Sequence, residues 1–227
     1  MELESLERLE ELPIFPLAAV LFPGAVLPLH IFEERYKNMM RFAIDHDGLF
    51  GLSYRADAEV GRETILEPGS IGCLAKINAV MPLEEGKMNL VSIGVVRYRV
   101  LEFRQLVPFL LARVEPFRDA PEENAGVEDL FGEIRELCMK FLVAAGILEE
   151  SGSPLETHLP EEPEAFSLLL ASLLPIDNDV KQALLEMTST KLRLIRLKNH
   201  VVTAIADYNK HQLMQDRAKG NGKGSLN

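Results

Sequence analysis

The prevailing hydrophobic period of this 227-residue chain differs between its first and second halves, and that difference most constrains the fold. From about Leu12 to Phe117, the apolar residues form short runs that alternate with polar ones or are interrupted by proline, which is typical of β-strands. From Val127 onward they recur every three or four residues, which predicts amphipathic helices. We therefore expect an α+β protein with its strands first and its helices last.

The first half is predicted to be a sheet with a single helix inserted in it. Because proline cannot donate a hydrogen bond to a neighbouring strand, the two proline-containing runs are expected at sheet edges. The helix, Glu33 to Ile44, follows from apolar residues spaced three and four apart. Turns are expected at Leu21–Gly24 and at Glu67–Ser70. The predicted strands are residues 11–17, 25–32, 49–54, 71–83, 88–103 and 109–117.

One strand is predicted to bend at a glycine. Glu84 to Lys87 forms the turn of a hairpin. On the returning strand, the apolar positions change parity near Gly94, which is the effect of a β-bulge. A sheet that bends at a defined glycine favours a barrel over a flat sandwich.

The second half is predicted to be a helical bundle. Its helices are expected over residues 127–148, 163–174, 178–187 and from 189 or 190 to about 211. Asp177, and either Ser189 or Thr190, are the predicted N-caps. The domains expected are a barrel over 1–118 that includes one helix, a helical subdomain over 119–211, and a disordered glycine-rich tail over 212–227.

The charge of the chain is uneven. The chain has 24 Lys and Arg against 35 Asp and Glu, a net charge of −11, which argues against non-specific nucleic-acid binding. Residues 119–164 carry a net −11, with 13 acidic and 2 basic residues, so the remainder is neutral. The last helix is locally basic, and we expect the acidic segment to lie beside it and shield it. Its basic run is Lys191, Arg193, Arg196 and Lys198.

No catalytic or cofactor motif is found. The sequence contains no P-loop, no dinucleotide-binding glycine motif, no nucleophile elbow and no HExxH, so we expect no enzyme activity, cofactor or metal. Cys73 and Cys138 are interpreted as small apolar residues in a reducing cytoplasm. The N-terminus is acidic and no apolar run spans a membrane, so a cytoplasmic protein without membrane contact is expected.

Two groups on the strand half leave alternatives open. Arg97 and Arg99 share one strand face. They could bind a carboxylate or phosphate, or one could pair with an acidic residue such as Glu33 or Glu102 and hold the sheet against the helix. The loop at Phe22 and Pro23 is either a plug at the barrel end or part of an exposed recognition patch.

Several segments, in their order and spacing, resemble the N-terminal substrate-recognition domain of the ATP-dependent protease Lon. The resemblance covers about Leu12 to Ile205. The segments are LPIFPL (12–17), VLFPG (20–24), LPLHIF (27–32), ERY (34–36), GSIG (69–72), LEEGKMNL (83–90), GVVRYRV (94–100), LPID (174–177), KQALLEM (181–187) and KLRL (191–194).

The resemblance implies a PUA-like bent β-barrel followed by a helical bundle, and non-catalytic recognition of unfolded or damaged polypeptide. The chain ends before the ATPase and peptidase domains of Lon would begin, so neither activity is implied, and a stand-alone Lon-domain protein is expected. It could act as an adaptor with a full-length protease, and homodimerisation is left open. The alternatives are a PUA-like RNA-binding protein and a structural protein–protein interaction module. The candidate interaction residues are Phe15, Phe22, Pro23, His30, Phe32, Tyr36, Arg97 and Arg99.

Overall fold

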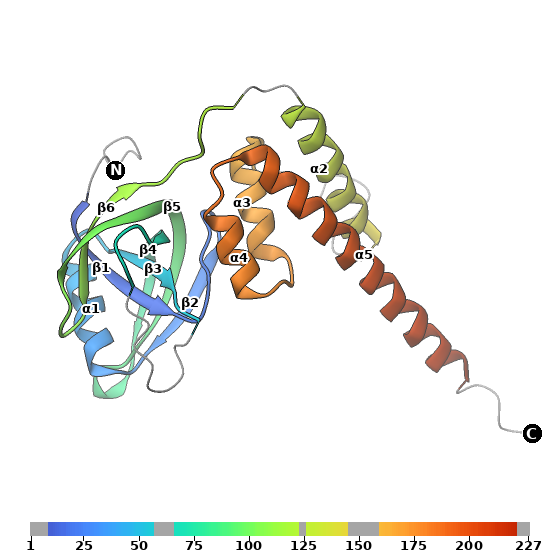
Figure 1. The fold of residues 1–227 in the computed structure, drawn as a ribbon. Helices are drawn as coiled ribbons and strands as arrows, with labels where there is room; N and C mark the ends of the chain where they lie inside the picture. The colour runs from blue at the N-terminus through green and yellow to red at the C-terminus, as the bar shows by residue number, and fades with distance from the viewer. Residues whose placement is uncertain (1–8, 57–65, 123–125, 145–158, 222–227) are drawn as a thin grey trace, which may run out of the picture.

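The computed structural model describes residues 9–56, 66–122, 126–144 and 159–221, and confirms the predicted order of strands followed by helices (Figure 1). The predicted break at residues 152–154 lies outside the described residues. The elements are β1 (Leu9–Leu17), β2 (Val26–Ile31), α1 (Glu34–Asp45), β3 (Leu49–Tyr54), β4 (Ile71–Pro82), the 3₁₀ turn η2 (Glu84–Gly86), β5 (Met88–Gln105), β6 (Leu110–Pro116), α2 (Val127–Ala144), α3 (Pro163–Leu173), α4 (Asn178–Leu185) and α5 (Thr190–Asn221).

Five strands close into a barrel. β1 pairs with β3 and β6, β4 pairs with β3 and β5, and a further pairing of β5 with β6 closes the ring. β5 is long enough to pair with a different strand along each of its two parts. Met88–Ile93 pairs with β2, and Tyr98–Gln105 pairs with β6. The predicted barrel is thereby confirmed, with β2 as an extra strand at one end.

The predicted change of parity in β5 is a β-bulge. Leu74 pairs with Val96 but Ala75 pairs with Gly94, so Val95 has no partner in the ladder. Gly94 also exchanges backbone hydrogen bonds of 2.9 Å with Gly24 and Ala25. A Cβ atom at Gly94 would lie 2.1 Å from the carbonyl oxygen of Phe22, so only glycine fits this approach.

The expectation that both proline-containing strands lie at sheet edges is correct for β2 and wrong for β1, which lies between β3 and β6. The reason is in the register. Leu9 to Ile14 pairs with β6, whereas Ile14 to Leu17 pairs with β3. Each half of β1 therefore has a partner on one side only, which leaves room for the prolines at positions 13 and 16.

The helical half departs from expectation at the helix ends. α5 continues past His211 to Asn221, through residues that were expected to belong to the tail. Asp177 occupies the N-cap position of α4 without a side-chain capping hydrogen bond. Ser189 does cap α5, because its Oγ accepts a hydrogen bond of 3.1 Å from the backbone N–H of Leu192.

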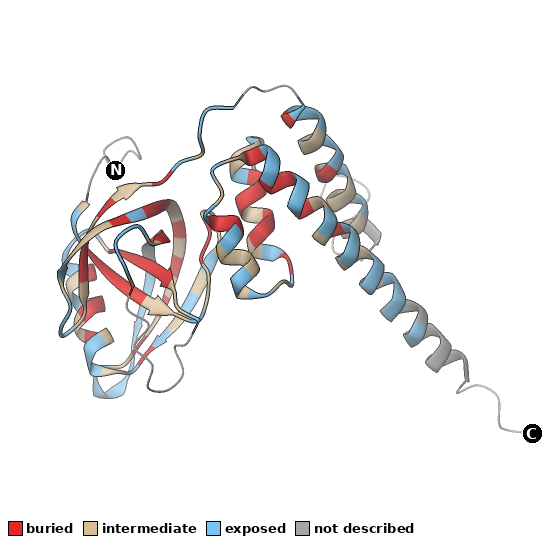
Figure 2. Cartoon of the chain, in the orientation of Figure 1, coloured by how far each residue is buried: buried red, intermediate tan, exposed pale blue. Residues whose placement is uncertain are grey.

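The two halves share an apolar core. Two clusters of buried side chains lie within the barrel, and a third joins it to the helices. In this third cluster, Phe22, Ile71 and Phe117 from the barrel half pack with residues of α2, α3, α4 and α5. Figure 2 shows buried residues in the barrel strands and on the facing sides of α3, α4 and α5.

Candidate functional site

One end of the barrel opens into a three-stranded flap, formed by β2 (26–31), the first part of β5 (88–93) and the last part of β4 (77–82). The paired β3 stops opposite Lys76, so among the described residues the flap extends beyond the closed ring. Its strands are in register: His30 lies opposite Asn89, and Asn89 lies opposite Met81. Residues directly opposite one another on neighbouring strands point to the same face of a sheet, so these three residues share one face.

This outer face of the flap is apolar and open to solvent. Phe32, which follows β2, is 57% exposed, and Met81 is 51% exposed. Exposed apolar side chains grouped in this way are typical of binding surfaces. We call this surface the flap face. It comprises Val26, Pro28, His30, Phe32, Ala79, Met81, Asn89, Val91 and Ile93.

His30 organises the centre of the flap face. Its Nδ1 lies 2.7 Å from the Oδ1 of Asn89, and its ring stacks on Phe32 with the ring centroids 5.8 Å apart. These contacts give the face one polar pair, His30 and Asn89, within an apolar surrounding. Such a surface suits an extended peptide, which offers apolar side chains together with backbone hydrogen-bonding groups.

The opposite face of the flap packs on α1. Ile31, Met88 and Leu90 belong to the same buried cluster as Met39 and Met40 of this helix. Lys37 of α1 also donates a hydrogen bond of 3.0 Å to the carbonyl of Glu85 in the hairpin turn. The flap face is thus presented on a supported sheet rather than on a loop.

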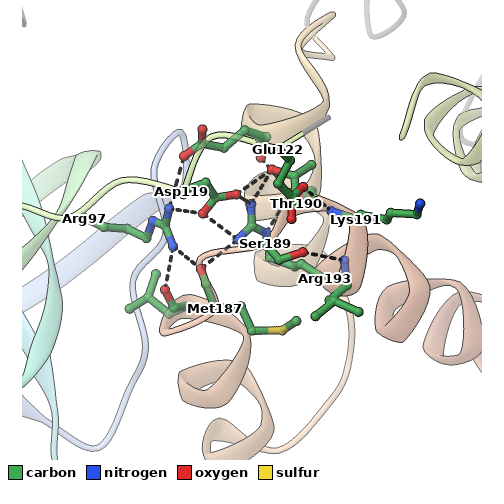
Figure 3. A network of polar contacts seen from close by, with 12 residues as sticks. Arg97, Asp119, Glu122, Met187, Ser189, Thr190, Lys191 and Arg193 are labelled. Atoms are coloured by element: carbon green, nitrogen blue, oxygen red, sulfur yellow. Dashed lines mark hydrogen bonds and ion pairs between the residues drawn. The ribbon is translucent and has the colours of Figure 1, made fainter. Parts of the chain in front are cut away.

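The junction between barrel and helices contains a buried polar network (Figure 3). Arg97 of β5 donates hydrogen bonds to Asp119 (2.5 Å), to Glu164 (3.1 Å) and to the carbonyls of Leu185 and Met187. Arg97 is 1% exposed. Through these hydrogen bonds its guanidinium links β5 to the β6–α2 connector, to α3 and to the α4–α5 turn.

Asp119 shares this network with a second buried arginine. Arg193 of α5, fully buried, contacts both carboxylate oxygens of Asp119 and also donates to Ser167. Burial by itself would raise the pKa of Asp119. The hydrogen bonds from Arg193, Thr190 and Arg97 outweigh burial and hold this pKa below its usual value.

The structure distributes the candidate interaction residues over three places. His30 and Phe32 lie together on the flap face. Phe15 is buried and packs against the half-buried Tyr36, with ring centroids 4.4 Å apart. The remaining four, Phe22, Pro23, Arg97 and Arg99, lie elsewhere in the barrel half.

These four residues are near the junction, and most of them are buried or paired with other residues of the chain. Phe22 is fully buried in the core shared with the helices, so it is not part of an exposed patch, and Pro23 lines a junction cavity of about 320 Å³. Arg97 pairs with Asp119 and Glu164, not with the expected Glu33 or Glu102. Arg99 is exposed and pairs with Glu115 on the neighbouring strand.

The expected proximity of acidic segment and basic helix is confirmed. Lys198 forms a 2.6 Å ion pair with Glu133 of α2, and the backbone N–H of Lys191 donates to Glu122. Arg193, which belongs to the predicted basic run, is not a surface charge at all. Two of the four residues in the basic run, Arg193 and Lys198, therefore pair with acidic side chains of the same chain.

A second concave surface was not anticipated. A cavity of about 580 Å³ lies between α2, α3 and α5, and its walls are almost entirely apolar. The signal available in the sequence was the high apolar content of α3. In the structure, Leu173 of this helix is strongly exposed. The walls include Phe141, Leu142, Leu173, Ile205 and Tyr208.

Groups suited to metal or thiol chemistry are sparse. In the described parts of the chain, His, Cys, Asp and Glu form no cluster of three or more that could hold a metal ion. Both cysteines are free thiols. Burial raises the pKa of Cys73 strongly and that of Cys138 to about 11, so both are poor nucleophiles at neutral pH. None of the described helices is long and apolar enough to cross a membrane.

The fold and the site define a class: a closed β-barrel with an apolar flap, fixed by a buried ionic network to a helical subdomain. Residues 11–203 match the family model of the ATP-dependent protease La (LON) substrate-binding domain, and the chain belongs to this family. Two solved structures show the same fold. The N-terminal domain of the Mycobacterium avium complex Lon protease has a TM-score of 0.66 at 18% identity, covering 85% of this chain and 98% of that one. The Lon N-terminal domain protein from Xanthomonas campestris has a TM-score of 0.54 at 22% identity, covering 83% and 97%.

The curated relatives are much longer proteins. Lon protease 2 of Myxococcus xanthus is 29% identical over 185 residues, which are 81% of this chain and 22% of that protein. Lon protease of Koribacter versatilis is 26% identical over 192 residues, or 84% and 24%. This chain thus spans less than a quarter of either relative, and the shared part is the substrate-binding domain.

Proposed function

We propose that this chain is a non-catalytic polypeptide-recognition module that binds unfolded, apolar segments on the flap face. The observation that carries the proposal is the exposure of Phe32 and Met81 on a supported sheet, on either side of the His30–Asn89 contact. Membership of a substrate-binding domain family supports the same assignment.

The form of the flap suits an extended ligand. In the described chain, β2 pairs on one side only, and β4 loses its β3 partner beyond Lys76. Apolar side chains of a bound segment would lie on the flap face, where their burial supplies roughly 25 cal/mol per Å². A disordered ligand loses conformational freedom on binding, so we expect micromolar affinity.

The proposal includes a cytoplasmic location and an adaptor role, in which the chain holds polypeptide for a full-length Lon protease. The RNA-binding alternative loses its main support, because Arg193 is buried and Lys198 is paired with Glu133. Non-specific RNA binding needs positive charge that is available to phosphates.

The test is a titration with a reduced and alkylated, permanently unfolded protein labelled with a fluorophore. We expect binding to the native chain and at least about tenfold weaker binding to the double variant Phe32→Ser/Met81→Ser. Leu106→Ser, which alters an exposed leucine on the β5–β6 loop, is the matched control and should bind like the native chain. Absence of binding at high micromolar concentration, or equal binding by the double variant, would contradict the proposal.

A further inference from the structure

α5 carries a second exposed apolar surface, on the side opposite its core contacts. Leu194, Leu197 and Val201 are buried against the bundle, whereas Leu192, Ile195 and Val202 are 57%, 44% and 50% exposed. Figure 2 shows exposed residues along the outer side of this helix. We call this surface the α5 strip and define it as Leu192, Ile195, Asn199, Val202 and Ala206.

The spacing of the α5 strip is that of a coiled-coil seam. Its members follow one another at intervals of 3, 4, 3 and 4 residues, so they occupy alternating a and d positions of a heptad. Asn199 takes an a position, where a polar residue favours one register over others at some cost in affinity. Such a seam is shaped to receive one further helix.

The charges beside the α5 strip determine which helix fits. Lys191 and Lys198 flank it on one side and Arg196 on the other; Arg196 is exposed and has no ion pair among the residues that the structure describes. Glu133 pairs with Lys198, and farther along the helix are Asp207 and Lys210. The half of the strip with its largest apolar residues is thus bordered by basic groups.

We propose that the α5 strip binds an amphipathic helix of a partner protein whose apolar face is flanked by Asp and Glu. A second copy of this chain in parallel alignment fits poorly, because two such strips would bring Lys191, Arg196 and Lys198 against like charges. An acidic helix gains both the apolar contact and the charge complementarity. This surface lies on the helical subdomain and is independent of the flap face.

The probe is a labelled synthetic peptide of about three heptads, with Leu at a and d and Glu at e and g; a second peptide has Lys at e and g. Fluorescence anisotropy should show the acidic peptide binding the native chain at least about tenfold more tightly than the basic one, with affinity falling as salt rises. Arg196→Glu should reduce this preference by about tenfold or more.

Two valines supply a matched control. Val202→Ser should weaken binding of the acidic peptide about tenfold, whereas Val107→Ser, which alters an exposed valine on the β5–β6 loop, should leave it unchanged. Both positions are exposed, so circular dichroism should show both variants folded. Equal binding of the two peptides, no binding of the acidic peptide, or a dimer in ultracentrifugation that Val202→Ser abolishes would each overturn the proposal.

Discussion

Arg97 and Arg99 show how two residues of one strand can differ in role. Both guanidinium groups lie over the ring of Phe117, at 5.1 and 4.8 Å from its centroid. Arg97 is buried among acidic and carbonyl oxygens, while the Arg99 side chain is 44% exposed. We expect Arg97→Met to cost about 3–5 kcal/mol of unfolding free energy, because it breaks a buried ion pair.

The matched change Arg99→Met should cost under about 1 kcal/mol, since exposed ion pairs contribute little. Urea unfolding of both variants measures the difference. Equal costs at the two positions would show that the buried network does not hold the two halves together.

Asp119 predicts a pH dependence of stability. Its pKa is lower in the folded state than in the unfolded chain, so its contribution is complete above the unfolded pKa. That contribution is lost as the pH falls through the folded-state pKa. The variant Asp119→Asn should therefore have a lower unfolding free energy than the native chain at neutral pH. This difference in unfolding free energy should shrink as the pH falls to about 3. Urea unfolding across this range measures the difference, and a constant difference would refute the linkage.

Gly94 sets the bend of β5 at the scale of the element. A Cβ there would meet the backbone oxygen of Phe22, which cannot move as a flexible side chain can. We expect Gly94→Ala to destabilise the chain by more than about 2 kcal/mol. Gly132→Ala in α2, where a Cβ would meet no atom within 4 Å, should instead stabilise by about 0.5–1 kcal/mol. Thermal unfolding of the two variants measures both changes in stability. Similar changes at Gly94 and Gly132 would show that the bend tolerates a side chain.

Local patterns predicted most elements. The hairpin, β3 and the start of α2 follow from residues adjacent in sequence, and the parity change located the bulge beside Gly94. The interior position of β1 was missed because its proline signal is local, whereas its partners β3 and β6 are determined by barrel closure.

Tertiary contacts account for what the sequence could not show of the candidate site. Strand period placed Arg97 and Arg99 on one face, but only the packing of the connector and α5 buries Arg97. His30 and Phe32 were candidates, whereas Met81 joined them through pairing across β5. The cavity between α2, α3 and α5 combines three segments, and no single periodicity reveals it.

At the scale of the whole molecule, the residues that join the two halves differ from those proposed to bind polypeptide. The ionic network and the shared core fix the barrel to the helices, while His30, Asn89 and Met81 lie toward the β4–β5 hairpin, at the opposite end of β2 from the junction. On the proposed function, unfolded polypeptide binds at the flap face and not in the helical cavity.

Hydrogen–deuterium exchange, measured with and without saturating unfolded polypeptide, tests this claim most directly. We expect slower exchange in residues 26–32 and 78–83 of the bound chain, and unchanged exchange in α3 and α5. Protection confined to the helices around the cavity, with the flap unchanged, would contradict it.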